Sequence, residues 1–166
     1  MAYLSRPDRV ARALDPCGSL PSARSMVVVG VDYSRAGLAP EVCADPSRGL
    51  IAAYAHGADY HDAILPRLAA LSERAGDVLG RPVAHRALVD FGPVLERDAA
   101  MRAGLGFIGR NTMLIHPRRG AWSFLAELLA DDPLVPDGEA AAADSRASLP
   151  DPCGSTRRCL DSCPTG

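Results

Sequence analysis

The sequence predicts an α/β domain, and three segments carry this prediction. Met26–Tyr33 and Val83–Asp90 are dominated by apolar residues, a pattern typical of strands in a sheet. Met26–Tyr33 is expected to be buried on both faces because its apolar run is nearly continuous. Between the two strands, residues 59–79 are expected to form one amphipathic helix, since apolar side chains recur there at helical spacing: Ile64, Leu68, Leu71, Ala75 and Val78.

Proline and glycine place the ends of the helices. A short helix over Arg9–Leu14 should stop at the Asp-Pro pair that follows, because the residue before a proline disfavours helical backbone. Pro66 lacks an N–H and should kink the long helix or delay its start, whereas Gly80 should end it. Pro93 suits the first turn of a further helix, which is expected to end at Gly104.

The next segment is expected to form a hairpin. Residues 112–115 and 121–129 are apolar and flank the sequence HPRRG, which is typical of a turn. From Asp131 the periodicity is lost, so residues 131–150 are predicted to be a linker. The linker separates a domain over residues 1–130 from a short segment over residues 151–166.

Composition limits the classes of protein. With 166 residues, 48% of them hydrophobic, and a net charge of −2, the chain can bury a core and has no overall field that attracts nucleic acid or membrane. No apolar segment is long enough to span a bilayer, and the N-terminus lacks the apolar region of a signal peptide. We therefore expect a cytoplasmic protein without membrane contact.

Asp90 is the first candidate for chemistry. It ends an apolar run, so its carboxyl is expected to be partly desolvated, which would raise its pKa and let it donate a proton near neutrality. The competing interpretation is an aspartate that caps the helix beginning near Pro93. The residues themselves leave both interpretations open.

A glycine-rich loop follows at Gly104, Gly106 and Gly109. Its spacing fits GxGxxG, but it precedes a predicted strand rather than a helix, which argues against a phosphate loop. A loop that lets backbone approach a large flat ligand is the better functional interpretation.

Three cysteines near the C-terminus form the second candidate. Cys153, Cys159, Cys163 and the following Pro164 match the first, third and fourth cysteines and the proline of the ferredoxin pattern C-x2-C-x2-C-x3-C-P. Thr156 stands where the second cysteine belongs. Because a hydroxyl replaces a soft thiolate ligand poorly, this chain by itself is not expected to hold an intact [4Fe–4S] cluster.

These motifs resemble those of tRNA epoxyqueuosine reductases along nearly the whole chain. The resemblance rests on AYAHGADYH, LVDFGPVLERDAAMRAGLGFIGRNTMLI, GAWSFLAELL and the ending CGSTRRCLDSCPTG, in that order. It implies an α/β cobalamin-binding domain like that of reductive dehalogenases, followed by the start of a ferredoxin-like domain. It also implies an oxidoreductase that uses cobalamin and [4Fe–4S] clusters to convert epoxyqueuosine in tRNA to queuosine, the last step of that pathway.

The resemblance implies roles for individual residues. Asp90 matches the proposed proton donor to the epoxide-derived oxygen, and Cys153, Cys159 and Cys163 match cluster ligands. Tyr60 and His61 belong to the DYH motif, and either helix packing or ligand contact suits them. The following positions match cofactor-binding positions: Leu114, Leu125, Asn111, Gly106, Gly109 and Ala53.

The implied partners are tRNA carrying epoxyqueuosine and an electron donor that the sequence does not identify, with the protein acting as a monomer. Compared with the family pattern, the chain is expected to be shortened at both ends. The alternative to an enzyme is therefore a non-catalytic remnant of one, unable to hold its clusters.

Overall fold

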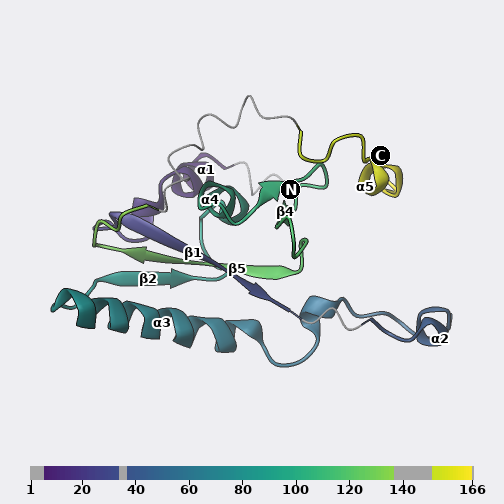
Figure 1. The fold of residues 1–166 in the computed structure, drawn as a ribbon, viewed down its shortest axis with the longest axis horizontal. Coiled ribbons are helices and arrows are strands. Elements are labelled where there is room, and N and C mark those ends of the chain that lie inside the picture. Colours follow the sequence, from purple (N-terminus) through teal and green to yellow (C-terminus); the bar gives the residue numbers. More distant parts are fainter. Residues whose placement is uncertain (1–5, 34–36, 137–150, 166) are drawn as a thin grey trace.

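A three-stranded sheet with helices on both faces forms the body of the protein (Figure 1). The computed structural model describes residues 6–33, 37–136 and 151–165. The helices and short helical turns are α1 (Pro7–Leu14), η1 (Pro16–Gly18), α2 (Pro40–Cys43), η2 (Ala53–Ala55), α3 (Tyr60–Leu79), α4 (Glu96–Arg102) and α5 (Arg158–Asp161). The strands are β1 (Ser25–Asp32), β2 (His85–Leu88), β3 (Phe107–Ile108), β4 (Leu114–Ile115) and β5 (Ser123–Ala130). The mixed α/β class is confirmed.

The larger sheet has the order β1-β5-β2, and both pairings are antiparallel. Gly30 of β1 lies opposite Leu125, while Glu127 lies opposite Val28 on one side and Leu88 on the other. The expectation that Met26–Tyr33 is buried on both faces is wrong, because β1 is an edge strand with half-buried residues. The central strand is β5, and its residues 126–130 are fully buried.

Helix α3 covers one face of this sheet. Ile64 and Leu68 of α3 pack with Val89, Ala126 and Leu128 to form the core. The ends of the helix follow the sequence: the Asp59 side chain accepts a hydrogen bond from the backbone N–H of His61 at 2.9 Å, and Gly80 closes the helix at φ 65°. Pro66 lies inside the helix and does not delay its start.

The second layer is formed by α4, which contacts β5 and β1, and by the small sheet of β3 and β4. The prediction for Pro93 is wrong: α4 begins three residues later, at Glu96, and its C-cap is Ala103. Gly104 follows at φ 80°, as expected for a residue that ends a helix.

The predicted hairpin is also wrong in its pairing. Leu114 and Ile115 pair with β3, whereas β5 pairs with β1 and β2. A single bridge between His116 and Gly120 closes the HPRRG turn. The apolar residues of β5 point to both faces, so burying them requires the central place in the larger sheet rather than the edge of a hairpin.

The predicted linker is described only at residues 131–136, and the rest of it lies outside the described residues. In those parts of the chain that the structure describes, no helix is both long and apolar enough to cross a membrane.

Candidate active site

Asp90 sits at the tip of a tight turn directly after β2. Its φ is 55°, a region that residues other than glycine rarely adopt. The N–H of Phe91 donates to the carbonyl of Val89 at 2.5 Å, so Asp90 is the central residue of a γ-turn with positive φ. Because Val89 is only 1% exposed, the turn begins from a fixed point in the core and projects Asp90 outward.

Two neighbouring elements hold Asp90. Its backbone N–H donates to Oε1 of Glu96 at 2.8 Å, and the hydroxyl of Tyr60 donates to its carboxylate oxygen Oδ2. The Tyr60 ring is fixed in turn by stacking on Phe124, with ring centroids 4.0 Å apart and an interplanar angle of 8°. Helix α3 thus positions the carboxylate and helix α4 positions the backbone.

Both expectations for Asp90 are therefore corrected. The residue is exposed rather than partly desolvated, because the γ-turn lifts it off the apolar strand. It does not cap α4 either: Leu95 precedes the helix, and no side chain caps that end. The two segments are joined instead by a hydrogen bond in which the Asp90 N–H donates to the Glu96 carboxylate of the helix.

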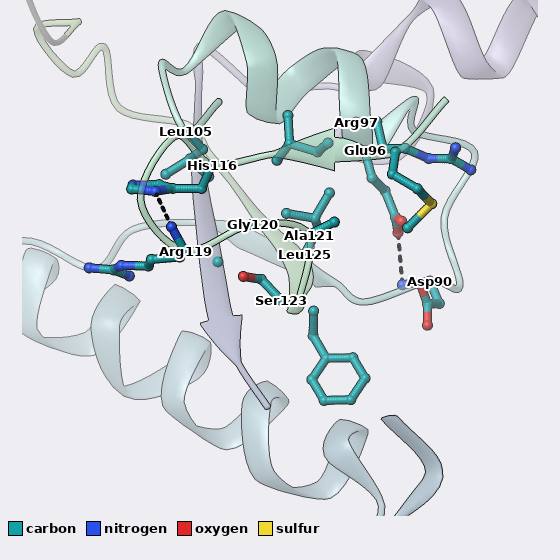
Figure 2. Close-up of a pocket in the computed structure, with 14 residues that line it drawn as sticks. Asp90, Glu96, Arg97, Leu105, His116, Arg119, Gly120, Ala121, Ser123 and Leu125 are labelled. Carbon is teal, nitrogen blue, oxygen red and sulfur yellow. Dashed lines mark hydrogen bonds between the residues drawn. The ribbon is translucent and has the colours of Figure 1, made fainter. Parts of the chain in front are cut away.

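A cavity of about 360 Å³ opens beside this turn (Figure 2). Its walls come from β1, β5, α4, the small sheet and the HPRRG turn, and they combine apolar with charged side chains. The lining residues are Gly30, Asp90, Glu96, Arg97, Leu105, Met113, Leu114, His116, Arg119, Gly120, Ala121, Ser123, Phe124 and Leu125. Asp90 and Glu96 lie together at one end, whereas His116 and Arg119 lie at the other.

The charged residues at the site are held by their neighbours. Arg97 donates to the carbonyl of Thr112 at 2.5 Å and so ties α4 to the turn before β4. His116 accepts the backbone N–H of Arg119 at 3.2 Å through Nδ1, and the Arg119 guanidinium lies 3.8 Å from the Asp32 carboxylate. The end opposite Asp90 therefore combines an imidazole with an arginine that is paired with a carboxylate.

Two glutamates next to Asp90 have raised pKa values. Burial is the larger cause for Glu96, and the negative charge of Asp90 adds to it. Burial also raises the pKa of Glu127 to about 8, with further contributions from the charges of Glu96 and Asp90. Glu127 is 0% exposed, and neither of its carboxyl oxygens has a hydrogen-bond partner among the described residues. A carboxyl that holds its proton at neutral pH thus lies beneath the site.

The structure brings some of the predicted cofactor-binding residues together with Asp90 and not others. Leu114 and Leu125 line the cavity beside it. Gly106, Gly109, Asn111 and Ala53 are not among the lining residues, and their assignment to a cofactor stays a prediction. Ala53 begins η2, away from the cavity.

The two glycines have a structural role of their own. A Cβ at Gly106 would lie 2.4 Å from the carbonyl oxygen of Ile115, and one at Gly109 would lie 2.5 Å from the Ile115 side chain. Asn111 stabilises the same turn, since its Oδ1 accepts the backbone N–H of Met113 at 3.2 Å. The glycine-rich sequence thus permits close contact between β3 and β4.

The cysteine segment, residues 151–165, is attached to this layer by Arg110. The guanidinium donates to the carbonyls of Gly154 at 2.8 Å and Thr156 at 3.1 Å, and it pairs with the Asp151 carboxylate at 2.5 Å. Asp151 also accepts the backbone N–H of Cys153 at 2.8 Å. These two hydrogen bonds lower the pKa of Asp151, the Cys153 N–H being the larger cause.

Of the three cysteines of this segment, Cys153 is partly buried, whereas Cys159 and Cys163 are exposed. Across residues 6–33, 37–136 and 151–165, no three His, Cys, Asp or Glu side chains are grouped as they would be around a metal ion. The arrangement therefore does not fit a complete cluster site, and the metal role of Cys153, Cys159 and Cys163 stays a prediction.

Sequence reasoning missed Glu127 as a residue of the site. Its signal was present: Glu127 is the single charged residue in the otherwise apolar strand sequence SFLAELLA. A carboxyl in the middle of a strand that is buried on both faces is itself buried, and a buried carboxyl with a perturbed pKa is a candidate for a functional site. For Tyr60, the structure supports a contact with the candidate acid in addition to packing.

The fold and site define a class: an α/β domain that presents an aspartate on a tight turn above an open, partly acidic cavity. The family model Epoxyqueuosine reductase QueG, DUF1730, matches residues 14–91. An epoxyqueuosine reductase from Leadbetterella byssophila is 36% identical over 165 residues, which are 99% of this chain and 49% of that protein.

Solved structures agree. The Bacillus subtilis epoxyqueuosine reductase, in a form with its catalytic aspartate loop swung out of the active site, is 32% identical, with a TM-score of 0.75 over 96% of this chain and 40% of that one. An epoxyqueuosine reductase with an epoxyqueuosine-modified tRNA-Tyr stem loop is 30% identical, with a TM-score of 0.75 and the same coverage. The chain therefore belongs to the epoxyqueuosine reductase family. It spans less than half the length of these relatives.

Proposed function

We propose that this chain is the substrate- and cobalamin-binding part of an oxidoreductase that reduces epoxyqueuosine to queuosine in tRNA. The observation that carries the proposal is the placement of Asp90, which is fixed by Tyr60 and Glu96 at the edge of the cavity. Removing the epoxide oxygen requires two electrons and two protons, with water as the second product. One of these protons has to reach the oxygen that leaves the carbon skeleton, and Asp90 is the group we assign to this transfer.

The cavity offers both apolar and charged walls to one part of a large ligand. Leu114 and Leu125 supply apolar walls, and the small residues Gly30, Gly120 and Ala121 leave backbone open on the same side. Arg97 and Arg119 lie among them and suit polar or anionic groups at the edge of such a ligand. Cobalamin bound here would supply the reducing equivalents at the substrate carbon. Asp90, at the edge of the cavity, would pass a proton to the leaving oxygen.

The tRNA partner is proposed from the relative whose structure includes a modified tRNA stem loop. A nucleotide reaching Asp90 would enter from the exposed side of the γ-turn. The Bacillus subtilis relative, with its catalytic loop swung out, further suggests that the Asp90 turn has two positions and closes over bound substrate.

The cysteine segment gives less support to bound [4Fe–4S] clusters than the cavity gives to the placement of Asp90. Thr156 occupies a ligand position, and the described residues form no group of three ligand side chains. We therefore assign no electron-transfer step to these cysteines. Thr156 favours the second candidate, a non-catalytic member of the family that keeps the cavity without its clusters.

Reconstitution tests the two candidates. The purified chain is incubated anaerobically with reduced cobalamin and an epoxyqueuosine-modified anticodon stem loop, with a chemical reductant replacing the unidentified electron donor. Queuosine formation is measured by mass spectrometry of the digested RNA. The wild-type chain should form queuosine, and Asp90→Asn, which keeps the size but not the proton, should lower the rate by about 100-fold or more.

Cobalamin binding is measured separately by absorption of the filtered complex. Asp90→Asn should bind cobalamin as the wild type does, which separates the proton role from cofactor binding. Equal rates for wild type and Asp90→Asn would refute the role of Asp90. Cobalamin binding without turnover by the wild type would support the non-catalytic candidate.

A further inference from the structure

We propose that Glu96 is a positioning residue that holds the Asp90 turn closed through the Asp90 backbone N–H. This inference rests on the proposed role of Asp90, but its physical content, the hydrogen bond that fixes the turn, is measurable without substrate or cofactor. Three features of the molecule support this role: the strain of the turn, its hydrogen bond to Glu96 and the fixed position of α4.

The turn carries a conformational cost. Asp90 has a φ of 55° and is not glycine, so its Cβ is crowded against its own backbone. The backbone hydrogen bond described across the turn joins the Phe91 N–H to the Val89 carbonyl. The Asp90 N–H takes no part in that bond and can donate to another acceptor. An extended backbone would relieve this crowding. The observed conformation therefore needs contacts from outside the turn.

Glu96 supplies the contact to the backbone. Its Oε1 accepts the Asp90 N–H at 2.8 Å, and a hydrogen bond to a carboxylate is stronger than one between neutral groups. The bond is local to the turn and bridges only six residues of chain. Tyr60 holds the carboxylate but makes no described bond to the Asp90 backbone. The conformation of the turn thus depends on Glu96, and the direction of the acid depends on Tyr60.

Glu96 is itself rigidly placed. It begins α4, which packs on β5, and the next residue, Arg97, is bound to the Thr112 carbonyl. Asp90 faces Glu96 from the turn, and burial together with the negative charge of Asp90 raises the pKa of Glu96. Glu127 faces it from β5, and burial likewise raises the pKa of that carboxyl, with further contributions from the charges of Glu96 and Asp90. The hydrogen bond that Glu96 accepts from the Asp90 N–H offsets the repulsion between the two carboxylates.

Backbone amide exchange, followed residue by residue with NMR on the uniformly ¹⁵N-labelled chain, tests the proposal. In the wild type, the Asp90 amide should exchange more slowly than an unprotected amide, although the residue is exposed. Glu96→Ala removes the acceptor, and Asp90 exchange should become about tenfold faster or more. Glu96→Gln keeps an oxygen at the same place and should retain most of the protection.

Asp98→Ala is the matched control. Asp98 lies in the same helix, is also acidic, and bonds Arg102 rather than the turn. Its loss should leave Asp90 exchange unchanged. The amides of β5 should exchange alike in all variants, which separates opening of the turn from loss of the fold.

Three results would overturn the proposal: an unprotected Asp90 amide in the wild type, unchanged exchange in Glu96→Ala, or exchange in Glu96→Gln as fast as in Glu96→Ala. The first needs no variant and keeps the proposal testable if Glu96→Ala does not fold. Because no turnover is measured, a failure of the proposed reductase activity leaves the outcome of this experiment unaffected.

Discussion

Substituting Glu127 by glutamine should remove a large part of the loss of stability that this domain undergoes as pH rises. The Glu127 carboxyl is buried without a hydrogen-bond partner in the described part of the protein, and its pKa is raised from 4.5 to about 8. Between these two values, the folded chain holds a proton that the unfolded chain has released. Stability should therefore fall as pH rises through this window, by about 1.4 kcal/mol per pH unit.

The full effect can be bounded from the same two values. A carboxyl whose pKa moves from 4.5 to about 8 destabilises the folded state by at most about 5 kcal/mol once it is ionised. The effect is complete above the folded-state pKa and absent below the unfolded-state value. Glu127→Gln has no such proton, so its stability should fall less with pH over this range than that of the wild type, and it should exceed the wild type at pH 8. The raised pKa of Glu96 remains in both chains.

Urea unfolding at pH 5, 6.5 and 8, followed by far-ultraviolet circular dichroism, measures this difference. The slope of free energy against urea should be the same for both chains, so that midpoints compare directly. Glu73→Gln, on the exposed side of α3, is the control for losing a glutamate and should follow the wild type. A wild type and Glu127→Gln with parallel pH dependences would refute the assignment of a buried, protonated carboxyl.

Two further substitutions test the second layer. Gly106→Ala places a Cβ 2.4 Å from the Ile115 carbonyl oxygen and should destabilise the domain by about 2 kcal/mol or more in thermal unfolding. Gly49→Ala is the control and should have little effect, because no atom lies within 4 Å of the added carbon. Equal melting temperatures for the two variants would contradict the close contact at Gly106. Arg110→Gln removes the ion pair with Asp151 and should accelerate amide exchange throughout the cysteine segment while leaving β5 unchanged; unaltered exchange there would show that other contacts hold the segment.

Much of the fold follows from local pattern. Apolar spacing predicts a helix over residues 59–79, and α3 spans Tyr60–Leu79 with Asp59 at its start and Gly80 at its end. The ends of this helix depend on side chains a few residues apart, which the sequence displays directly. Strand β1 is likewise found within one residue of its predicted start and end.

Strand pairing could not be predicted in the same way. The segment 121–129 was expected to pair with its neighbour in sequence, yet β5 pairs with strands that begin about 40 and 100 residues earlier. Local apolar pattern identifies a strand but not its partners, since many pairings bury the same side chains. The predicted hairpin is therefore wrong in which strands pair, whereas both of its segments do contain strands.

The site was predictable where a motif carried it and not where packing did. The sequence motif identifies Asp90 as a candidate acid, a role that stays a prediction, and the structure places this residue at the cavity. The expected desolvation is wrong because a positive φ cannot be inferred from an Asp that follows an apolar run. Burial is the main cause of the raised pKa of both Glu96 and Glu127. The charge of Asp90 adds to it in both cases, and the charge of Glu96 adds to it for Glu127. Those causes arise only when β2, α4 and β5 meet.

The central position of β5 has a consequence for how the chain is made. In the described structure β1 and β2 pair with β5 and not with each other. During synthesis, both strands leave the ribosome before the strand that joins them, while α3 needs only its own residues to form its hydrogen bonds. A nascent chain halted before Ser123 would expose two unpaired strands with apolar side chains, a state prone to aggregation. Productive folding of this domain is thus expected to wait for the translation of a single eight-residue segment.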